Sequence, residues 1–248
     1  HVSGFFSTCS VILSELVIYF NTFKKEPNLL NTNHCFQWYG NNFTEYFKIT
    51  DKKIDYFNIN YHHDNQFINY KNVNITNIYP FIEKYFSPTN EITNIIKNME
   101  NKYNIDYKNT CVLFYRGNDK NKEVTIASYD DYINKANEVL IKNPNIKFLI
   151  QSDETEFIEK IIKKFPNNHF YFKDEIRHIK KCDSSVDKKM FKLNKYYSKF
   201  FLAIVLIMSK SNTILFGTGN ISLWILFYRQ NFNNVFQYLN NEWIELYF

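Results

Sequence analysis

The sequence predicts an α/β protein whose second half contains a parallel sheet. Segment 111–115 is wholly apolar and too short for two turns of amphipathic helix, which is typical of a strand buried on both faces. Segments 146–150 and 169–172 also predict strands. Apolar residues at helical spacing over 129–142 and 155–165 predict helices between them. This alternation predicts a parallel sheet with right-handed crossovers.

The composition is that of a folded and mildly basic protein. The 248 residues are 45% hydrophobic, 19% aromatic and 22% charged, with a net charge of +5. This length can bury a sizeable core and suits one large domain or two small ones. Lys and Arg are scattered among Asp and Glu, which argues against a nucleic-acid surface, so we expect no nucleic-acid partner.

The cysteines and the apolar runs predict no disulfide framework and no membrane segment. The 4 cysteines are far apart and form no CxxC pair, so a reducing compartment is the simpler expectation. The longest apolar run, 200–208, is too short to span a bilayer, and no signal peptide is recognisable. We expect a cytoplasmic chain, or a soluble domain whose targeting segment preceded His1.

The first twenty residues predict a glycine turn that opens a helix. Gly4 precedes Ser7 and Thr8, which are possible N-caps, and apolar residues follow at helical spacing. A strand end, a glycine turn and a helix would leave backbone N–H groups facing a ligand. A close-packed turn without a ligand fits this stretch equally well.

The region before the predicted sheet has weaker patterns. Polar, Asn-rich joints separate short apolar pieces that predict strands at 35–39, 56–61 and 73–75. Residues 80–102 predict a helix broken at Ser87-Pro88. The polar connector 104–109 is the expected domain boundary.

His62, His63 and Asp64 are residue types that bind metals. Adjacent histidines point to opposite sides of a strand, and no third ligand stands at a helical or hairpin offset. A solvated loop is therefore favoured, and we expect no metal site.

Two of the predicted strands end in charged loops. Arg116, Gly117 and Asp119 follow the first strand, and Asp153 follows the second. Loops at the carboxyl ends of parallel strands converge on one crevice, where Arg116 could present a forked cation to a phosphate from an exposed loop. The alternatives are a surface turn in which Arg116 pairs with Asp119, and an Asp153 that complements a helix dipole.

The stretch after residue 172 predicts a second anion-binding loop. A buried helix at 200–208 and a strand at 213–216 precede GTGN at 217–220, which leads into another helix. A glycine loop that opens a helix is a general anion cradle, and tight packing would explain it as well. The charged stretch 173–195 fits either a mobile loop near the site or a solvated segment.

These motifs, taken together, resemble the C-terminal half of the inverting fucosyltransferases with two Rossmann-like domains, the superfamily of α1,2-, α1,6- and protein O-fucosyltransferases. FYRGNDK at 114–120 resembles their HxRxxDK loop. LIQSDETEFIEKIIKKFPN at 149–167 resembles their strand that ends in SDD before a helix. LIMSKSNTILFGTGNISLWI at 206–225 is similar to their final signature, and GFF at 4–6 is compatible with their first glycine loop.

The resemblance implies a GT-B-like fold, with two Rossmann-like parallel-sheet domains and a cleft between them, the N-terminal one small or incomplete. The expected parts are an acceptor-side domain at 1–108, a nucleotide-sugar-binding domain at 109–230, and a segment at 231–248 that packs back on the N-terminal domain.

The resemblance also implies metal-independent, inverting transfer from a GDP-sugar such as GDP-fucose to a glycan or protein hydroxyl. Arg116 would then stabilise the diphosphate and Glu123 would be the candidate base. The expected donor-binding residues are Gly4, Phe5, Phe6, Asp119, Lys120, Ser152, Asp153, Thr218, Gly219, Asn220, Ile221 and Ser222.

Two positions depart from the family pattern. Phe114 stands where the family has a His two residues before the arginine, and Ile204 or Val205 stands where an Asp faces the nucleobase. A noncatalytic nucleotide-sugar or glycan-binding protein of the same fold is therefore the alternative function. A basic, aromatic-rich nucleic-acid binder is the second alternative.

Overall fold

The computed structural model describes residues 3–33, 35–40, 42–55 and 58–247. Its centre is a six-stranded sheet in the order β5-β4-β3-β6-β7-β8. The first five of these strands pair in parallel, and β8 pairs with β7 in the antiparallel direction. The strands are β3 (Thr110–Tyr115), β4 (Lys147–Ser152), β5 (His169–Phe170), β6 (Thr213–Gly217), β7 (Val235–Leu239) and β8 (Glu242–Leu246). The prediction of an α/β fold with a parallel sheet is confirmed.

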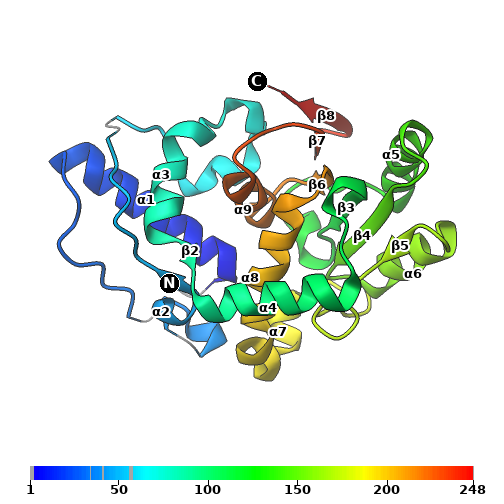
Figure 1. Cartoon of the computed structure of the whole chain (residues 1–248), viewed down its shortest axis with the longest axis horizontal. Helices are drawn as coiled ribbons and strands as arrows, with labels where there is room; N and C mark the ends of the chain where they lie inside the picture. The colour runs from blue at the N-terminus through cyan, green and yellow to red at the C-terminus, as the bar shows by residue number, and fades with distance from the viewer. Residues whose placement is uncertain (1–2, 34, 41, 56–57, 248) are drawn as a thin grey trace.

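Helices cover both faces of this sheet (Figure 1). Helices α5 (Tyr129–Lys142) and α6 (Thr155–Lys164) connect β3, β4 and β5 and share a core with one face of the sheet. Helices α8 (Asn194–Lys210) and α9 (Asn220–Arg229) pack on the other face. Strand β3 serves both layers, because alternate side chains point to opposite faces: Cys111 and Leu113 to one, Val112 and Phe114 to the other.

The strand order places a topological switch point between β3 and β6. The chain moves outward from β3 to β4 and β5, then returns through α8 to the opposite side of β3. Open α/β sheets bind ligands at such a point, because the loops after the two central strands diverge and leave a crevice between them. The loops that begin at Arg116 and Thr218 flank this crevice.

The N-terminal part forms a helical layer outside α8 and α9, on the left of Figure 1. Before β3, the strands among the described residues are β1 (Phe47–Lys48) and one partner, β2 (Ser87–Pro88). The N-terminal Rossmann-like domain, expected to be small or incomplete, therefore contains no parallel sheet in the described part. The helices are α1 (Phe5–Phe23), α2 (Phe43–Tyr46), α3 (Ile75–Tyr85) and α4 (Asn90–Tyr103).

This layer differs from the sequence-based expectation in its local structure. The strands predicted at 35–39 and 73–75 are wrong, since 3-10 helices at Gln37–Tyr39 and Tyr70–Asn72 and the start of α3 occupy these regions. Side-chain oxygens of Asn69 and Asn74 accept backbone N–H groups and so start turns in place of strand pairing. The strand predicted at 56–61 falls partly outside the described residues, and 58–61 carry no strand. The break at Ser87-Pro88 lies between α3 and α4, as predicted.

Helix α1 begins earlier than predicted. Gly4 is its N-cap, so Ser7 and Thr8 lie in its first turn and do not cap it. By length and composition α1 could cross a membrane, but 61% of its most apolar window is buried inside the protein, as in a core helix. Phe6 of α1 packs edge-on against Phe201 and at a tilt against Trp224 of the sheet-covering helices. The helical layer thus shares one core with a face of the sheet, and the boundary at 104–109 stays a prediction.

The C-terminal segment completes the sheet as the β7–β8 hairpin, for which the sequence analysis assigned no strands. Gln237 on β7 also accepts the backbone N–H of Tyr70 and donates to the carbonyl of Ile68. The ammonium of Lys71 lies 3.6 Å from the ring centre of Tyr247. This segment therefore contacts both the sheet and the N-terminal layer.

Candidate functional site

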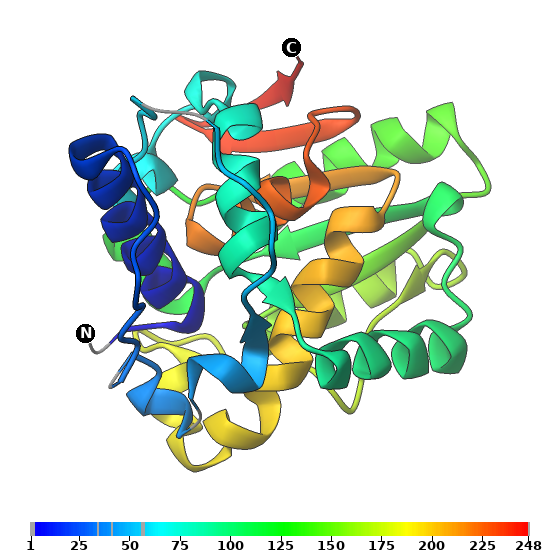
Figure 2. The same cartoon turned by 60° about the vertical axis from the view of Figure 1, so that its left-hand side comes forward.

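A cavity of about 440 Å³ lies at the switch point, where three turns from distant parts of the sequence meet. Its walls come from the start of α1, the loop after β3 and the start of α9. Figure 2 shows α1 and α9 near one another across the carboxyl ends of the central strands. The lining residues include Gly4, Phe5, Phe6, Arg116, Asp119, Lys120, Glu123, Thr218, Gly219, Asn220, Ile221 and Ser222. The volume is in the range of a small-molecule site.

Arg116 lies between acidic side chains at the base of this cavity. Its guanidinium donates to Asp153, to Asp119 at 2.6 Å and to the carbonyl of Gly117 at 3.0 Å. Burial lowers the pKa of Arg116, but the carboxylates of Asp153 and Asp119 outweigh burial and the pKa is raised. The side chain is only 23% exposed, so the expectation of an exposed loop is wrong. The arginine both pairs with Asp119, as in the alternative interpretation, and lines the cavity.

The loop that carries Arg116 is held by the residues that follow β4. Asp153 accepts the backbone N–H of Gly117 at 2.9 Å and a side-chain N–H of Asn118 at 2.9 Å. Glu154 is fully buried and accepts the backbone N–H of Asn118. Because these carboxylates are used by the loop, Asp153 positions Arg116 and lines a neighbouring, smaller cavity.

Lys120 places a second cation at the start of α9. Its side chain is 9% exposed and forms a 2.6 Å ion pair with Glu123. A Cβ atom built on Gly219 would lie 3.2 Å from Cε and 3.3 Å from Nζ of Lys120. The end of the lysine side chain therefore lies close to Gly219, and both groups line the same cavity.

The start of α9 offers backbone donors, but not from every residue that was predicted. The Gly219 N–H, expected to face a phosphate, donates to the hydroxyl of Tyr70 at 2.8 Å. The hydroxyl of Thr218 donates to the carbonyl of Tyr238, and that of Ser222 to the carbonyl of Gly217. These hydroxyls are therefore engaged in holding the loop.

The first N–H groups of α9 remain for a ligand. The N-terminal N–H groups of a helix have no intrahelical acceptor, and those of Asn220, Ile221 and Ser222 meet no acceptor among the described residues. All three residues line the cavity. The side chain of Asn220 is held by Ser10 and Gln66, which fixes the direction of this helix end.

The start of α1 contributes packing and two backbone donors, because the N–H groups of Phe6 and Ser7 meet no acceptor among the described residues. The N–H of Phe5 donates to the hydroxyl of Tyr39 at 2.6 Å, and the carbonyl of Gly4 accepts the N–H of Thr8. The rings of Phe5 and Phe6 are each 1% exposed and belong to the core. Their edges border the cavity without bringing polar groups to it.

Ser152 does not line either cavity in the described part of the protein. It is 1% exposed, and its hydroxyl accepts the N–H of Glu154 at 3.0 Å. It therefore shapes the turn after β4, and donor contact by this side chain is not supported by its position. Its neighbour Asp153, the first residue after β4, instead bonds the loop after β3 and lines the smaller cavity.

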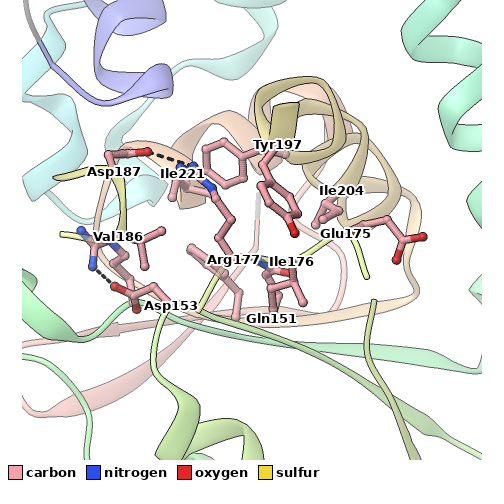
Figure 3. A pocket seen from close by; sticks show the side chains of 13 residues that line it. Gln151, Asp153, Glu175, Ile176, Arg177, Val186, Asp187, Tyr197, Ile204 and Ile221 are labelled. Carbon is pink, nitrogen blue, oxygen red and sulfur yellow. Dashed lines mark hydrogen bonds and ion pairs between the residues drawn. The ribbon is translucent and has the colours of Figure 1, made fainter. Parts of the chain in front are cut away.

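The smaller cavity, of about 70 Å³, lies beside the first and is shown in Figure 3. The two cavities share the lining residues Phe114, Arg116, Asp187, Phe201 and Ile221. The remaining wall is made by the end of β4, the segment 175–177 that follows β5, the start of α7, and α8.

The sequence analysis missed site residues in the charged stretch 173–195. Ser185, Asp187 and Lys188 line the larger cavity, in and before the short helix α7 (Val186–Lys189). Arg177 pairs with Asp187 at 2.9 Å and also donates to Asn194. Of the two alternatives for this stretch, proximity to the site is therefore the correct one. The sequence signal that could have identified these residues is the high density of charged side chains in 173–195 without a helical period.

His62, His63 and Asp64 lie away from both cavities. Their possible ligand atoms lie within 4.8 Å of one another, because the segment starts a 3-10 helix (His63–Phe67) and is not a strand. The prediction that His62 and His63 point to opposite sides of a strand is therefore wrong. Nδ1 of His62 accepts the N–H of Asp64, so this cluster also has a role in capping the turn.

The fold and the cavity together define an α/β protein with a Rossmann-like sheet and a crevice at its switch point. No protein-family model matches the chain, and no curated protein sequence matches it. Among solved structures, the chain is similar to the NodZ α-1,6-fucosyltransferase soaked with GDP-fucose, with 9% identity and a TM-score of 0.45. The similarity covers 69% of this chain and 53% of that chain, so it spans about half of that protein's length.

Proposed function

We propose that the protein is a metal-independent, inverting glycosyltransferase of the fucosyltransferase type. In this proposal it transfers a sugar from a GDP-sugar, such as GDP-fucose, to a hydroxyl of a glycan or protein. The observation that carries the proposal is the meeting of a guanidinium, an ammonium and a helix N-terminus in one cavity at the switch point. Each of these groups stabilises a phosphate, and together they suit a diphosphate leaving group.

The arginine retains donors for such a group. A guanidinium has five N–H donors, and three hydrogen bonds to Asp153, Asp119 and Gly117 are formed by Arg116. The remaining N–H groups are available to phosphate oxygens, and the two carboxylates hold the guanidinium plane in place. Such a fixed donor array stabilises charge without reorganisation during the reaction.

The proposed reaction is a single displacement. The acceptor oxygen attacks the anomeric carbon, and the bond from this carbon to the β-phosphate oxygen breaks with its electron pair on the diphosphate. Arg116, Lys120 and the first N–H groups of α9 neutralise the developing charge. Glu123, which lines the cavity and is 48% exposed, takes the acceptor proton.

The alternative is a noncatalytic protein that binds a nucleotide sugar or a glycan. Two observations favour it: Arg116 is already paired with two carboxylates, and Glu123 is paired with Lys120. Phe114 also lines the cavity, where the family pattern has a histidine.

One experiment separates the two functions. Isothermal titration with GDP, UDP and GDP-fucose measures binding, and release of GDP from GDP-fucose is followed with and without a set of glycan and peptide acceptors. We expect GDP binding and acceptor-dependent release. Binding without release in any acceptor mixture would support the noncatalytic protein. Absence of nucleotide binding would contradict the transferase and would leave only a glycan-binding protein.

A further inference from the structure

Gln151 on β4 is a buried polar residue whose side-chain carbonyl oxygen has no hydrogen-bond donor among the described residues. Its side chain is 6% exposed, and no described residue donates a hydrogen bond to its Oε1. It lies beside Phe114 of β3 in the sheet and lines the smaller cavity (Figure 3). Buried side-chain carbonyls are normally hydrogen-bonded, because an unpaired one loses its interaction with water without compensation.

A second buried glutamine in the same sheet shows the usual situation. Gln237 on β7 is fully buried, and its Oε1 accepts the N–H of Tyr70 at 3.0 Å. Its Nε2 donates to the carbonyl of Ile68 at 3.0 Å. Gln237 therefore connects the sheet to the N-terminal layer by hydrogen bonds, whereas the side-chain carbonyl of Gln151 makes no such bond within the described protein.

The smaller cavity lies where the nucleoside of a bound nucleotide would extend. The phosphate-binding groups lie at the ends of β3 and β6, and the smaller cavity extends from them toward β4 and α8. A nucleotide with its diphosphate at the switch point would direct its nucleoside along this edge of the sheet. Phe201, Ile204 and Ile176 provide apolar walls there.

The size of the cavity limits what can enter it. A cavity of about 150 Å³ accepts a benzene ring, so about 70 Å³ accepts less than a whole ring. The hydrogen-bonding edge of a base fits this space, while the remainder of the nucleotide occupies the larger cavity that shares its walls.

From these observations we propose that the smaller cavity receives the edge of the donor nucleobase and that Gln151 recognises it by hydrogen bonding. This inference rests on the proposed function and names the residue that senses the base. The carboxamide accepts an N–H of the base at Oε1 and offers its own N–H to a neighbouring ring carbonyl or nitrogen.

The test compares Gln151→Met with the wild-type protein. Methionine keeps the length of the side chain and removes the hydrogen-bonding groups. We expect the affinity for GDP to fall roughly three- to tenfold, as for loss of one or two hydrogen bonds. The affinity for inorganic pyrophosphate, which has no base, should not change. The melting temperature should be no lower than that of the wild type, because an unpaired buried group is removed.

Gln237→Met is the matched control, and it should lower the melting temperature because it removes a satisfied buried amide. A fall in melting temperature for Gln151→Met as large as for Gln237→Met, or failure of Gln151→Met to fold, would show a structural role and overturn the inference. Equal effects on GDP and pyrophosphate, or no effect on either, would also overturn it while leaving the proposed function standing. A wild-type protein that binds no nucleoside diphosphate at all would instead remove the proposed function.

Discussion

Gly117 is required by the space around it. Its backbone does not have a positive φ, but a Cβ at this position would lie 2.1 Å from Oε1 of Glu154 and 2.7 Å from Cε1 of Tyr115. Glu154 in turn is fully buried and accepts hydrogen bonds from Asn118 and Tyr129. A methyl group here must therefore displace the carboxylate that holds the loop.

Gly117→Ala should lower the free energy of unfolding by about 2–3 kcal/mol, the upper part of the range for overpacking. The loop that carries Arg116 should also lose order, so nucleotide binding should weaken. Urea unfolding and GDP titration measure the two effects. Gly4→Ala is the control, since the nearest atom to its Cβ would be 3.7 Å away. Equal stability of Gly117→Ala and Gly4→Ala would contradict the assigned geometry.

Arg116 is best tested with a variant that keeps its charge. Truncation to alanine would leave Asp119 and Asp153 close together without a cation, so loss of activity could reflect loss of folding. Arg116→Lys retains the charge but not the planar fork of donors. We expect release of GDP from GDP-fucose to fall by about 100-fold or more, as for loss of a preorganised oxyanion donor. Near-normal turnover in a folded Arg116→Lys protein would contradict the proposed role.

At the residue scale, the sequence predicted which cations line the cavity better than it predicted the residues that surround them. Arg116 and Lys120 were placed in the site because they follow a buried strand, and both line the cavity. Two neighbours could not be predicted because they are distant in sequence. The carboxylate of Asp187, whose charge acts on Arg116, is 71 residues from it, and the hydroxyl of Tyr70 is 149 residues from Gly219. Ser152 was misplaced because its turn rotates the hydroxyl toward Glu154.

At the scale of elements, α9 is anchored at both ends. Its start carries the backbone donors of the cavity, and its last residue, Arg229, holds the carbonyls of Ser209, Ser211, Asn212 and Asn233. Burial lowers the pKa of Arg229 to about 10, which leaves it charged at neutral pH. One side chain therefore ties the end of α9 to the turn between α8 and β6 and to the approach to β7.

Arg229→Ala should destabilise the protein by about 2–4 kcal/mol, because four carbonyls lose a charged donor. Arg229→Lys should recover only part of this loss, since an ammonium cannot reach all four acceptors in one plane. Chemical unfolding of the three proteins provides the comparison. An alanine variant as stable as wild type would show that this cap contributes little.

The central strands and α5 were predicted well, whereas α3 and α8 start five and six residues before their predicted starts and the short elements were predicted poorly. Helix α5 has the predicted bounds, and β3, β4 and β6 lie within one or two residues of theirs. Amphipathic period and buried apolar runs are local signals that suffice for such elements. The 3-10 helices before residue 75 depend on contacts with distant parts of the chain, which no local pattern reports. The helix Gln37–Tyr39 contacts α8, the helix His63–Phe67 contacts α9, and the ring of Tyr70 packs on Phe216 of β6.

At the scale of the whole molecule, stability should depend on pH through His178. Burial lowers its pKa below the usual 6.5, although Glu159 and Glu156 act in the opposite direction. The folded state therefore holds a neutral imidazole where the unfolded chain would take up a proton. As pH falls below about 6.5 the unfolded state binds more protons, so stability decreases until the folded-state pKa is passed.

His178→Gln should therefore lose less stability than the wild type between pH 7.5 and 5.5. All other side chains are the same in the two proteins, so the difference in slope reports His178. Urea unfolding at several pH values provides the slopes. Identical slopes for wild type and His178→Gln would contradict the assigned burial.

The sequence by itself determined the parallel sheet and the two charged or glycine-containing loops at its edge. These depend on short apolar runs, helical periods and breaker residues, which act between neighbours in the chain. Tertiary structure alone decided that the start of α1, the loop after β3 and the start of α9 enclose a single cavity. It also decided that Gln151 faces the smaller cavity, whereas Gln237 forms hydrogen bonds with the N-terminal layer. Such facts depend on which distant groups approach one another, because a hydrogen bond forms or fails over tenths of an ångström that sequence spacing does not specify.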